Sequence, residues 1–125
     1  MPKSEDPLVD RLLVEGLVDW LDPAWIASQA RDAGVSLDED VRAMTLGAVA
    51  VMLFGGLAVA GDVTENGFEP WKVPPAEAMA RIAAGLSFIP VGTERPGDVF
   101  WLSTTASGEA QGRQVREAMR DRRSG

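Results

Sequence analysis

The 125-residue chain contains no cysteine, no histidine and no tyrosine. Without cysteine, the protein has no disulfide and no thiolate that could act as a nucleophile or a metal ligand. Without histidine, it lacks the commonest general base, the commonest zinc ligand and the imidazole of a catalytic triad. These absences exclude most hydrolytic and zinc-dependent active sites.

A phosphate-binding loop is also missing, because neither G-x-G-x-x-G nor G-x-x-x-x-G-K-[ST] occurs in the chain. Three carboxylates follow one another at Asp38, Glu39 and Asp40. Consecutive side chains on a helix point about 100° apart, so these three cannot converge on one metal ion. Their place at a helix start is explained by the helix dipole, which favours negative charge there. We therefore expect no enzyme activity, no metal ion and no cofactor.

The charged start "MPKSEDP" lacks an apolar signal core, which together with the missing cysteine favours a cytoplasmic location. One long uncharged stretch lies between Arg42 and Asp62 and ends in "VMLFGGLAVAGD". A helix from residue 37 to Phe54 would span about 27 Å, slightly short of a bilayer core of about 30 Å. Gly55 and Gly56 are strong helix terminators. We expect a buried helix, a Gly-Gly turn and then a strand rather than a membrane span.

The net charge of −7 is unevenly distributed along the chain. Residues 1–110 carry 17 acidic and 7 basic side chains, whereas residues 111–125 carry five arginines and only two acidic residues. An acidic body repels phosphate backbones and attracts basic partners. The charge pattern therefore favours a basic protein over a nucleic acid as the partner.

Three helices are predicted in the first half of the chain. Apolar residues at three- and four-residue steps indicate a helix over residues 6–21. Asp22 is placed to cap a second helix over residues 23–33, which has proline at its first position. Ser36 and Glu39 have the spacing of a capping box at the start of the third helix.

The second half alternates between strands and helices. A strand is predicted over residues 57–64, followed by a turn at Asn66-Gly67. Paired prolines open a helix over residues 75–87, and a second strand is predicted over residues 99–104. A last helix carries the arginines of the C-terminus.

This order predicts a mainly helical α+β fold. Three N-terminal helices, two strands that pair as a wing with a helix inserted between them, and a C-terminal helix make up a winged-helix-like domain. Residues 1–112 form this single domain, and residues 113–125 are a basic C-terminal helix end or tail.

The segments "GLAVAGDVTENGFEPWKVPPAEAMARIAAGL" and "PGDVFWLSTTASGEA" resemble a group of small uncharacterised bacterial proteins. The matching positions are Gly56, Leu57, Ala60, Gly61, Asp62, Thr64, Gly67, Phe68 and Trp71; Pro75, Glu77, Ala78, Arg81 and Ile82; and Gly97, Asp98, Trp101, Thr105 and Gly108. Thr104 departs from the pattern, which has leucine there. The resemblance covers roughly residues 50–110. The group is similar to immunity partners of secreted bacterial toxins, and the closing strand and helix also resemble the wing of winged-helix regulators.

DNA binding is the alternative that this likeness leaves open. A recognition helix needs basic side chains, and the third helix offers only Arg42 before its long uncharged stretch. Glu65 and Glu69 in the segment "TENGFEP" would repel DNA. The basic stretch "RQVREAMRDRRSG" fits a solvated helix end, where cations are favourable. Nucleic-acid binding is therefore the less favoured interpretation.

The tryptophans and the apolar third helix bear on possible interfaces. Spacing places Trp20, Trp25 and Trp101 in the core, whereas Trp71 lies in a loop among proline and glutamate. An aromatic residue surrounded by acids suits a protein interface, and packing over the edge of the domain is the alternative. The third helix must be covered within the monomer or by another chain, which leaves a homodimer open.

Absent catalytic groups and an acidic body together predict a non-catalytic protein-binding module. Its expected role is that of a cytoplasmic immunity protein that occludes the active site of a cognate basic toxin domain, such as a nuclease. The predicted partner-binding residues are Asp62, Glu65, Glu69 and Trp71, with Asp38 and Asp40 as a second group. They are chosen for the exposure expected of turns and helix starts.

Overall fold

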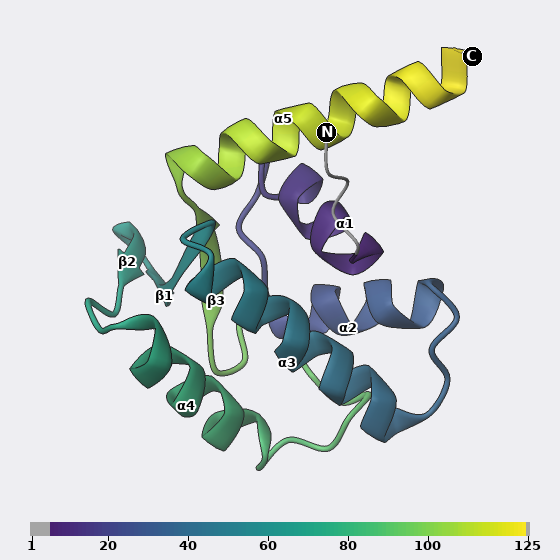
Figure 1. The fold of residues 1–125 in the computed structure, drawn as a ribbon. Helices are drawn as coiled ribbons and strands as arrows, with labels where there is room; N and C mark the ends of the chain where they lie inside the picture. The colour runs from purple at the N-terminus through teal and green to yellow at the C-terminus, as the bar shows by residue number, and fades with distance from the viewer. Residues whose placement is uncertain (1–5, 125) are drawn as a thin grey trace.

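A computed structural model describes residues 6–124 of the chain. The segment 1–5, which holds most of the charged start, lies outside the described residues. The chain forms the helices α1 (Pro7–Glu15), α2 (Pro23–Asp32), α3 (Asp38–Phe54), α4 (Pro75–Leu86) and α5 (Ala106–Ser124), and the strands β1 (Ala58–Thr64), β2 (Gly67–Pro70) and β3 (Trp101–Thr104). The predicted mainly helical α+β class is confirmed (Figure 1).

α1 ends at Glu15, well before the predicted end at residue 21. The apolar spacing continues past this point, but the chain leaves the helix at Gly16, where an added Cβ would collide with the Thr104 side chain. The chain then reaches Leu21, which forms an isolated antiparallel bridge with Leu102 of β3. Tertiary pairing therefore shortens the helix that the apolar pattern predicted.

The break at the glycine pair is confirmed. α3 ends at Phe54, Gly56 has a φ of +70°, and β1 begins at Ala58. The predicted capping box at the start of α3 is not formed, because Leu37 is the N-cap and makes no side-chain bond to the helix. No helix within residues 6–124 is both long enough and apolar enough to cross a bilayer.

The sheet has three antiparallel strands in the order β2-β1-β3 rather than the predicted two. The predicted pairing of the first and last strands is confirmed by the β1–β3 register. β2 was not predicted as a strand, although Asn66-Gly67 is a hairpin signal and Gly67 has a φ of +95°. The four residues of β2 are too few, and Phe68 is too isolated among polar neighbours, for a clear strand pattern.

The hydrophobic core lies where the helices meet the inner face of the sheet. α3 packs against α2, α4 and β1, and Figure 1 shows it between α2 and α4. Phe100, Leu102, Met52 and Ile82 have no solvent exposure. This position explains the apolar residues on the inner side of α3, whereas Val51 and Phe54 remain exposed on its outer side.

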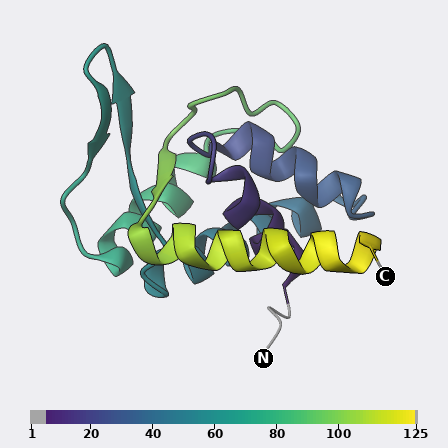
Figure 2. The same cartoon turned by 90° about the horizontal axis from the view of Figure 1, so that it is seen from above.

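α5 crosses α1 and extends beyond it, as both ribbon views show (Figures 1 and 2). Gly112 is buried at this crossing, where an added Cβ would meet the backbone carbonyl of Leu13 in α1, and Gly108 is buried against the backbone carbonyl of Leu57, just before β1. The helix continues without interruption to Ser124. Of the two options predicted for the basic C-terminal residues, the structure has the helix end, and the boundary at residue 112 falls inside α5.

Candidate functional site

The β1–β2 hairpin projects from the body of the molecule (Figure 2). It covers residues 58–70, and its tip is the exposed pair Glu65-Asn66. Asn66 donates its backbone N–H to Thr64 Oγ1 at 3.1 Å, which orders the turn. The sequence thus places an acidic side chain at the most protruding turn of the sheet.

The hairpin brings three of the predicted binding residues together. Asp62 and Glu69 are direct cross-strand partners, so their side chains share one face, and Glu65 lies at the tip. All three are exposed. The Glu69 carboxylate accepts a hydrogen bond from Thr64 Oγ1 at 3.1 Å, and no Lys or Arg side chain that the structure describes forms an ion pair with any of the three. Two like charges directly opposite each other are unfavourable, so a cation from a partner would relieve this repulsion.

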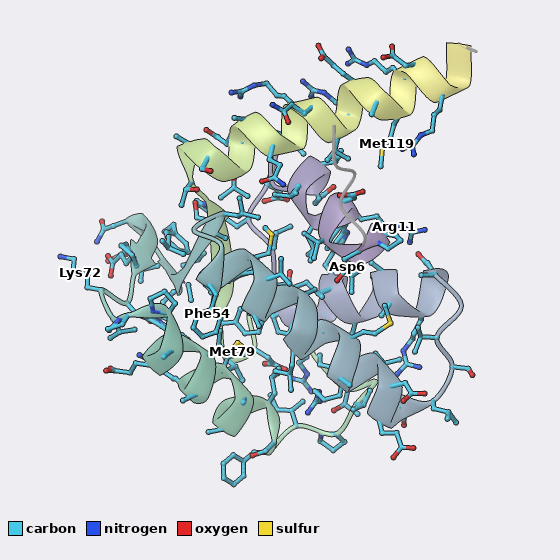
Figure 3. All side chains as sticks on the ribbon, in the orientation of Figure 1. Asp6, Arg11, Phe54, Lys72, Met79 and Met119 are labelled. Carbon is cyan, nitrogen blue, oxygen red and sulfur yellow. The ribbon has the colours of Figure 1, made fainter. Side chains whose placement is uncertain are left out.

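Trp71 lies at the base of this hairpin and is half-buried rather than fully exposed. The Arg81 guanidinium lies 3.8 Å from the centroid of its ring, a cation–π contact. Its indole Nε1 is buried and forms no hydrogen bond with any residue that the structure describes. Trp71 therefore packs against the edge of the core. Next to it, exposed Lys72 adopts a φ of +58°, and its side chain points outward (Figure 3).

The second predicted group, Asp38 and Asp40, does not join the hairpin. Both residues are exposed in the first turn of α3, and the hairpin follows the opposite end of that helix. The length of α3 separates them by about 25 Å at 1.5 Å per residue. Asp38 also pairs with Arg31 at 3.2 Å, and both side chains of this pair are exposed. Asp38 and Asp40 would therefore contact a different part of any partner.

Arg42 is the one basic residue on α3, the helix that would contact DNA bases in a winged-helix regulator. Its side chain is engaged in contacts within the protein. It donates to the carbonyl oxygens of Leu86 and Ile89 at 2.7 Å each and pairs with Glu94 at 3.3 Å. Its side chain is 17% exposed. The outer face of α3 presents Ala43, Gly47, Val51 and Phe54, none of which can neutralise a phosphate.

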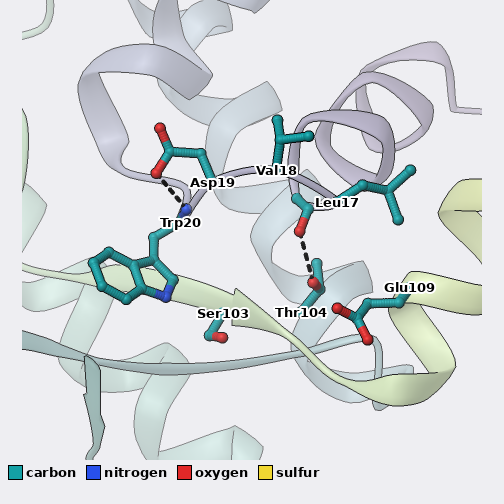
Figure 4. Close-up of a pocket in the computed structure, with 8 residues that line it drawn as sticks. Leu17, Val18, Asp19, Trp20, Ser103, Thr104 and Glu109 are labelled. Atoms are coloured by element: carbon teal, nitrogen blue, oxygen red, sulfur yellow. Dashed lines mark hydrogen bonds between the residues drawn. The ribbon is translucent and has the colours of Figure 1, made fainter. Parts of the chain in front are cut away.

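Sequence reasoning missed a groove between the α1–α2 connection, β3 and the start of α5. This cavity of about 330 Å³ is lined by Gly16, Leu17, Val18, Asp19, Trp20, Ser103, Thr104 and Glu109. Figure 4 shows the Trp20 indole and the Glu109 carboxylate on opposite sides, with Ser103 and Thr104 between them. The apolar spacing predicted that Trp20 lies in the core. Trp20 is instead 38% exposed, because α1 ends at Glu15, before the chain reaches Trp20.

Asp22, next to this groove, has a clearly shifted pKa. Burial raises the pKa of Asp22 above its ordinary value of 3.8, against the opposing effect of the hydrogen bonds from the backbone N–H groups of Trp25 and Ala24. The nearby carboxylates of Asp19 and Asp98 raise it further. Because its oxygen caps α2, we assign Asp22 a structural role.

The described residues contain no group of three or more carboxylates arranged to hold a metal ion. No family model, curated protein or solved structure matches the chain. The site must therefore be interpreted from its own geometry, which offers exposed carboxylates and an aromatic groove. This arrangement is suited to binding a cationic surface.

Proposed function

We propose that this protein is a non-catalytic binding module whose acidic hairpin docks onto a basic partner protein. The observation that carries the proposal is the exposed group Asp62, Glu65 and Glu69 on one projecting hairpin, with no ion-pair partner among the side chains that the structure describes. The biological role that this proposal favours is that of a cytoplasmic immunity protein that occludes the active site of a cognate toxin domain, such as a nuclease. Residues 50–110 resemble a group of small uncharacterised bacterial proteins, and the likeness of that group to immunity partners of bacterial toxins supports this role.

The electrostatics of the whole chain favour the same kind of partner. With a net charge of −7, the protein attracts a cationic domain over distances of about a Debye length, roughly 8–10 Å at physiological salt. A hairpin that projects from the body carries its charges toward the partner and reaches into a concave cleft. Such charges raise the association rate more than they raise the affinity.

DNA binding is a second candidate because α5 presents exposed arginines, among them Arg113, Arg120 and Arg122. Figure 3 shows nitrogen-tipped side chains along this helix. The internal use of Arg42 and the carboxylates of the hairpin argue against a recognition-helix mode. Any DNA binding would then involve α5 alone and would be independent of sequence.

The proposal is tested by titrating the protein against the product of the neighbouring reading frame on a size-exclusion column, with duplex DNA as a parallel ligand. We expect a stable complex with the neighbouring protein. A shift only with DNA, weakening steeply between roughly 50 and 200 mM salt, would favour the DNA-binding candidate instead.

Charge reversal locates the interface on that complex. We expect the double variant Glu65→Lys, Glu69→Lys to slow association by about tenfold or more and to reduce its salt dependence, because it reverses the steering charges of the hairpin. The matched control Glu117→Lys, Asp121→Lys makes the same change in net charge at exposed positions of α5. Equal slowing by both variants would remove the hairpin from the interface.

A further inference from the structure

We propose that the groove beside Trp20 is a binding site for an arginine side chain of a basic partner protein. The proposal rests on the proposed function, because it adds a second contact to the same kind of partner. It is argued from three features of the groove: an aromatic wall, unpaired carboxylates and a hydroxyl-lined floor.

The aromatic wall is the Trp20 ring, which contacts two further rings from separate parts of the fold. Trp20 comes from the α1–α2 connection, Phe68 from β2 and Trp101 from β3. The Trp20 ring lies 6.3 Å from Phe68 and 6.5 Å from Trp101 between centroids. These contacts hold an indole in place that is nevertheless 38% exposed. A ring fixed in this way presents a π surface at little entropic cost, as binding hot spots do.

The carboxylates lie on both sides of the floor. Asp19 precedes Trp20, and its carboxylate accepts the Trp20 backbone N–H at 2.8 Å. Glu109 lies in the first turn of α5 and is exposed on the opposite side, as Figure 4 shows. Among the residues that the structure describes, no Lys or Arg pairs with either group. The groove is therefore negatively charged and has no cation of its own.

The hydroxyl groups between these walls complete the polar lining. Thr104 already donates its hydroxyl hydrogen to the Gly16 carbonyl oxygen at 2.9 Å, which joins the α1 end to β3. Ser103 is half-buried, and no hydrogen bond of its side chain occurs within residues 6–124. Its hydroxyl can therefore accept a hydrogen bond from a ligand.

Arginine fits this combination better than lysine does. Its planar guanidinium stacks on an indole face while its N–H groups form paired hydrogen bonds to a carboxylate, and a lysine ammonium offers neither the plane nor the fork. In this groove the guanidinium would stack on Trp20 and donate to Glu109, with Asp19 adding attraction from the side. The volume of about 330 Å³ is at the lower end of the range for small-ligand sites, which suits one side chain rather than a large molecule.

The test uses the full protein and two octapeptides of alternating glycine and arginine or glycine and citrulline, since citrulline keeps the shape of arginine and lacks its charge. Binding is followed by NMR of the indole N–H signals. We expect the arginine peptide to bind about tenfold or more tightly than the citrulline peptide and to shift the Trp20 signal most. Equal binding of the two peptides, or no shift at Trp20, would overturn the proposal.

Variants distinguish binding in the groove from a general effect of the net charge of the protein. Glu109→Gln should weaken the binding of the arginine peptide about three- to tenfold. Asp121→Asn, which removes the same charge at an exposed site on the same helix, should leave the binding unchanged. Trp20→Leu keeps an apolar side chain against Phe68 and removes the π surface, so it should weaken binding with the fold retained, as urea denaturation would verify. Equal effects of Glu109→Gln and Asp121→Asn on peptide affinity would show that the peptide responds only to the net charge of the protein. This result would reject the groove as the binding site.

The outcomes also distinguish this inference from the proposed function. If the neighbouring protein binds through the hairpin while Glu109→Gln and Trp20→Leu leave its affinity unchanged, the groove proposal fails and the proposed function stands. If the arginine peptide requires Trp20 and Glu109 but no basic protein forms a complex, the groove remains a guanidinium site and the proposed function fails.

Discussion

Asp22 is a charged residue in a largely buried environment. Its carboxylate accepts the N–H groups of Ala24 and Trp25 at 2.8 and 3.1 Å, while its residue is only 8% exposed. The hydrogen bonds favour the ionised form and the burial opposes it, and the raised pKa shows that burial dominates. Asp22 therefore caps α2 with a carboxylate that is poorly solvated when ionised.

The substitution Asp22→Asn tests this balance. Because the folded-state pKa is raised, the folded protein binds more protons than the unfolded chain above about pH 3.8, so the contribution of Asp22 to stability falls as the pH rises through the folded pKa. Asparagine keeps the capping oxygen without the charge. We expect Asp22→Asn to be at least as stable as the natural protein at pH 7 and to lose this advantage as the pH approaches 4, measured by urea denaturation.

Asp22→Ala is the control for the cap. It removes the acceptor as well as the charge, so we expect it to lower the free energy of unfolding by about 1 kcal/mol relative to Asp22→Asn at pH 7. Stability curves of Asp22→Asn and the natural protein that stay parallel from pH 4 to pH 7 would contradict the raised pKa.

At the scale of elements, one ion pair ties α3 to the loop between α4 and β3. Besides its pairing with Arg42, Glu94 accepts the backbone N–H of Gly92 at 2.8 Å, and its side chain is only 5% exposed. Arg42 also closes the C-terminal end of α4 by binding the Leu86 carbonyl oxygen. A single side chain on α3 thus holds both the end of a helix and the loop that follows it.

Removing Arg42 should therefore be costly. We expect Arg42→Ala to lower the free energy of unfolding by about 3 kcal/mol, because it leaves the buried Glu94 carboxylate and two carbonyl oxygens without their partner. Arg31→Ala breaks the exposed pair with Asp38 and should cost less than about 1 kcal/mol. Urea denaturation of both variants provides the comparison, and similar losses would show that the Arg42 contacts are not specially stabilising.

At the scale of the whole molecule, charge is separated between the body and one helix. The hairpin and the start of α3 are acidic, whereas α5 carries exposed arginines on a helix that extends beyond the body (Figures 1 and 2). A basic partner would approach the acidic side and be repelled by the arginines of α5. Under the proposed function, the charge distribution of the entire chain would set the orientation of the complex.

Neutralising the arginines of α5 tests this orientation. The variant Arg113→Gln, Arg120→Gln, Arg122→Gln changes the net charge from −7 to −10, because three cationic side chains become neutral. We expect equal or faster association with a basic partner at low salt, measured by stopped flow, and no change in the fold, because all three side chains are exposed. Markedly slower association would place α5 in the interface.

The elements were predictable wherever a local signal determines the backbone. Asp22 and Pro23 begin a helix, Gly55 and Gly56 end one, and Asn66-Gly67 turns the chain in a hairpin. Each signal acts through the conformation of a few neighbouring residues. The end of α1 could not be predicted in this way, because it depends on contact with β3, about 80 residues later in the chain.

In the candidate site, too, local features could be predicted from the sequence and packing contacts could not. Exposure of Glu65 and Glu69 follows from their place in and beside a turn, and the sequence alone indicated it. Packing of Trp71 over the edge of the domain was one of two interpretations of the sequence. Its contact with Arg81 and the exposure of Trp20 could not be inferred, because each depends on which element packs against the ring. The groove beside Trp20 combines residues from three separate segments, so no local pattern reveals it.

By itself, the sequence determined the class of the fold, the acidic character of the protein and the absence of cysteine and histidine chemistry, because composition and local backbone preference suffice for these. Only the tertiary structure decided that Arg42 is engaged internally, that Asp62 lies opposite Glu69 and that Trp20 faces a negatively charged groove. The physical reason is that burial, ion pairing and ring contacts depend on distances between residues far apart in the chain, which local preferences do not specify.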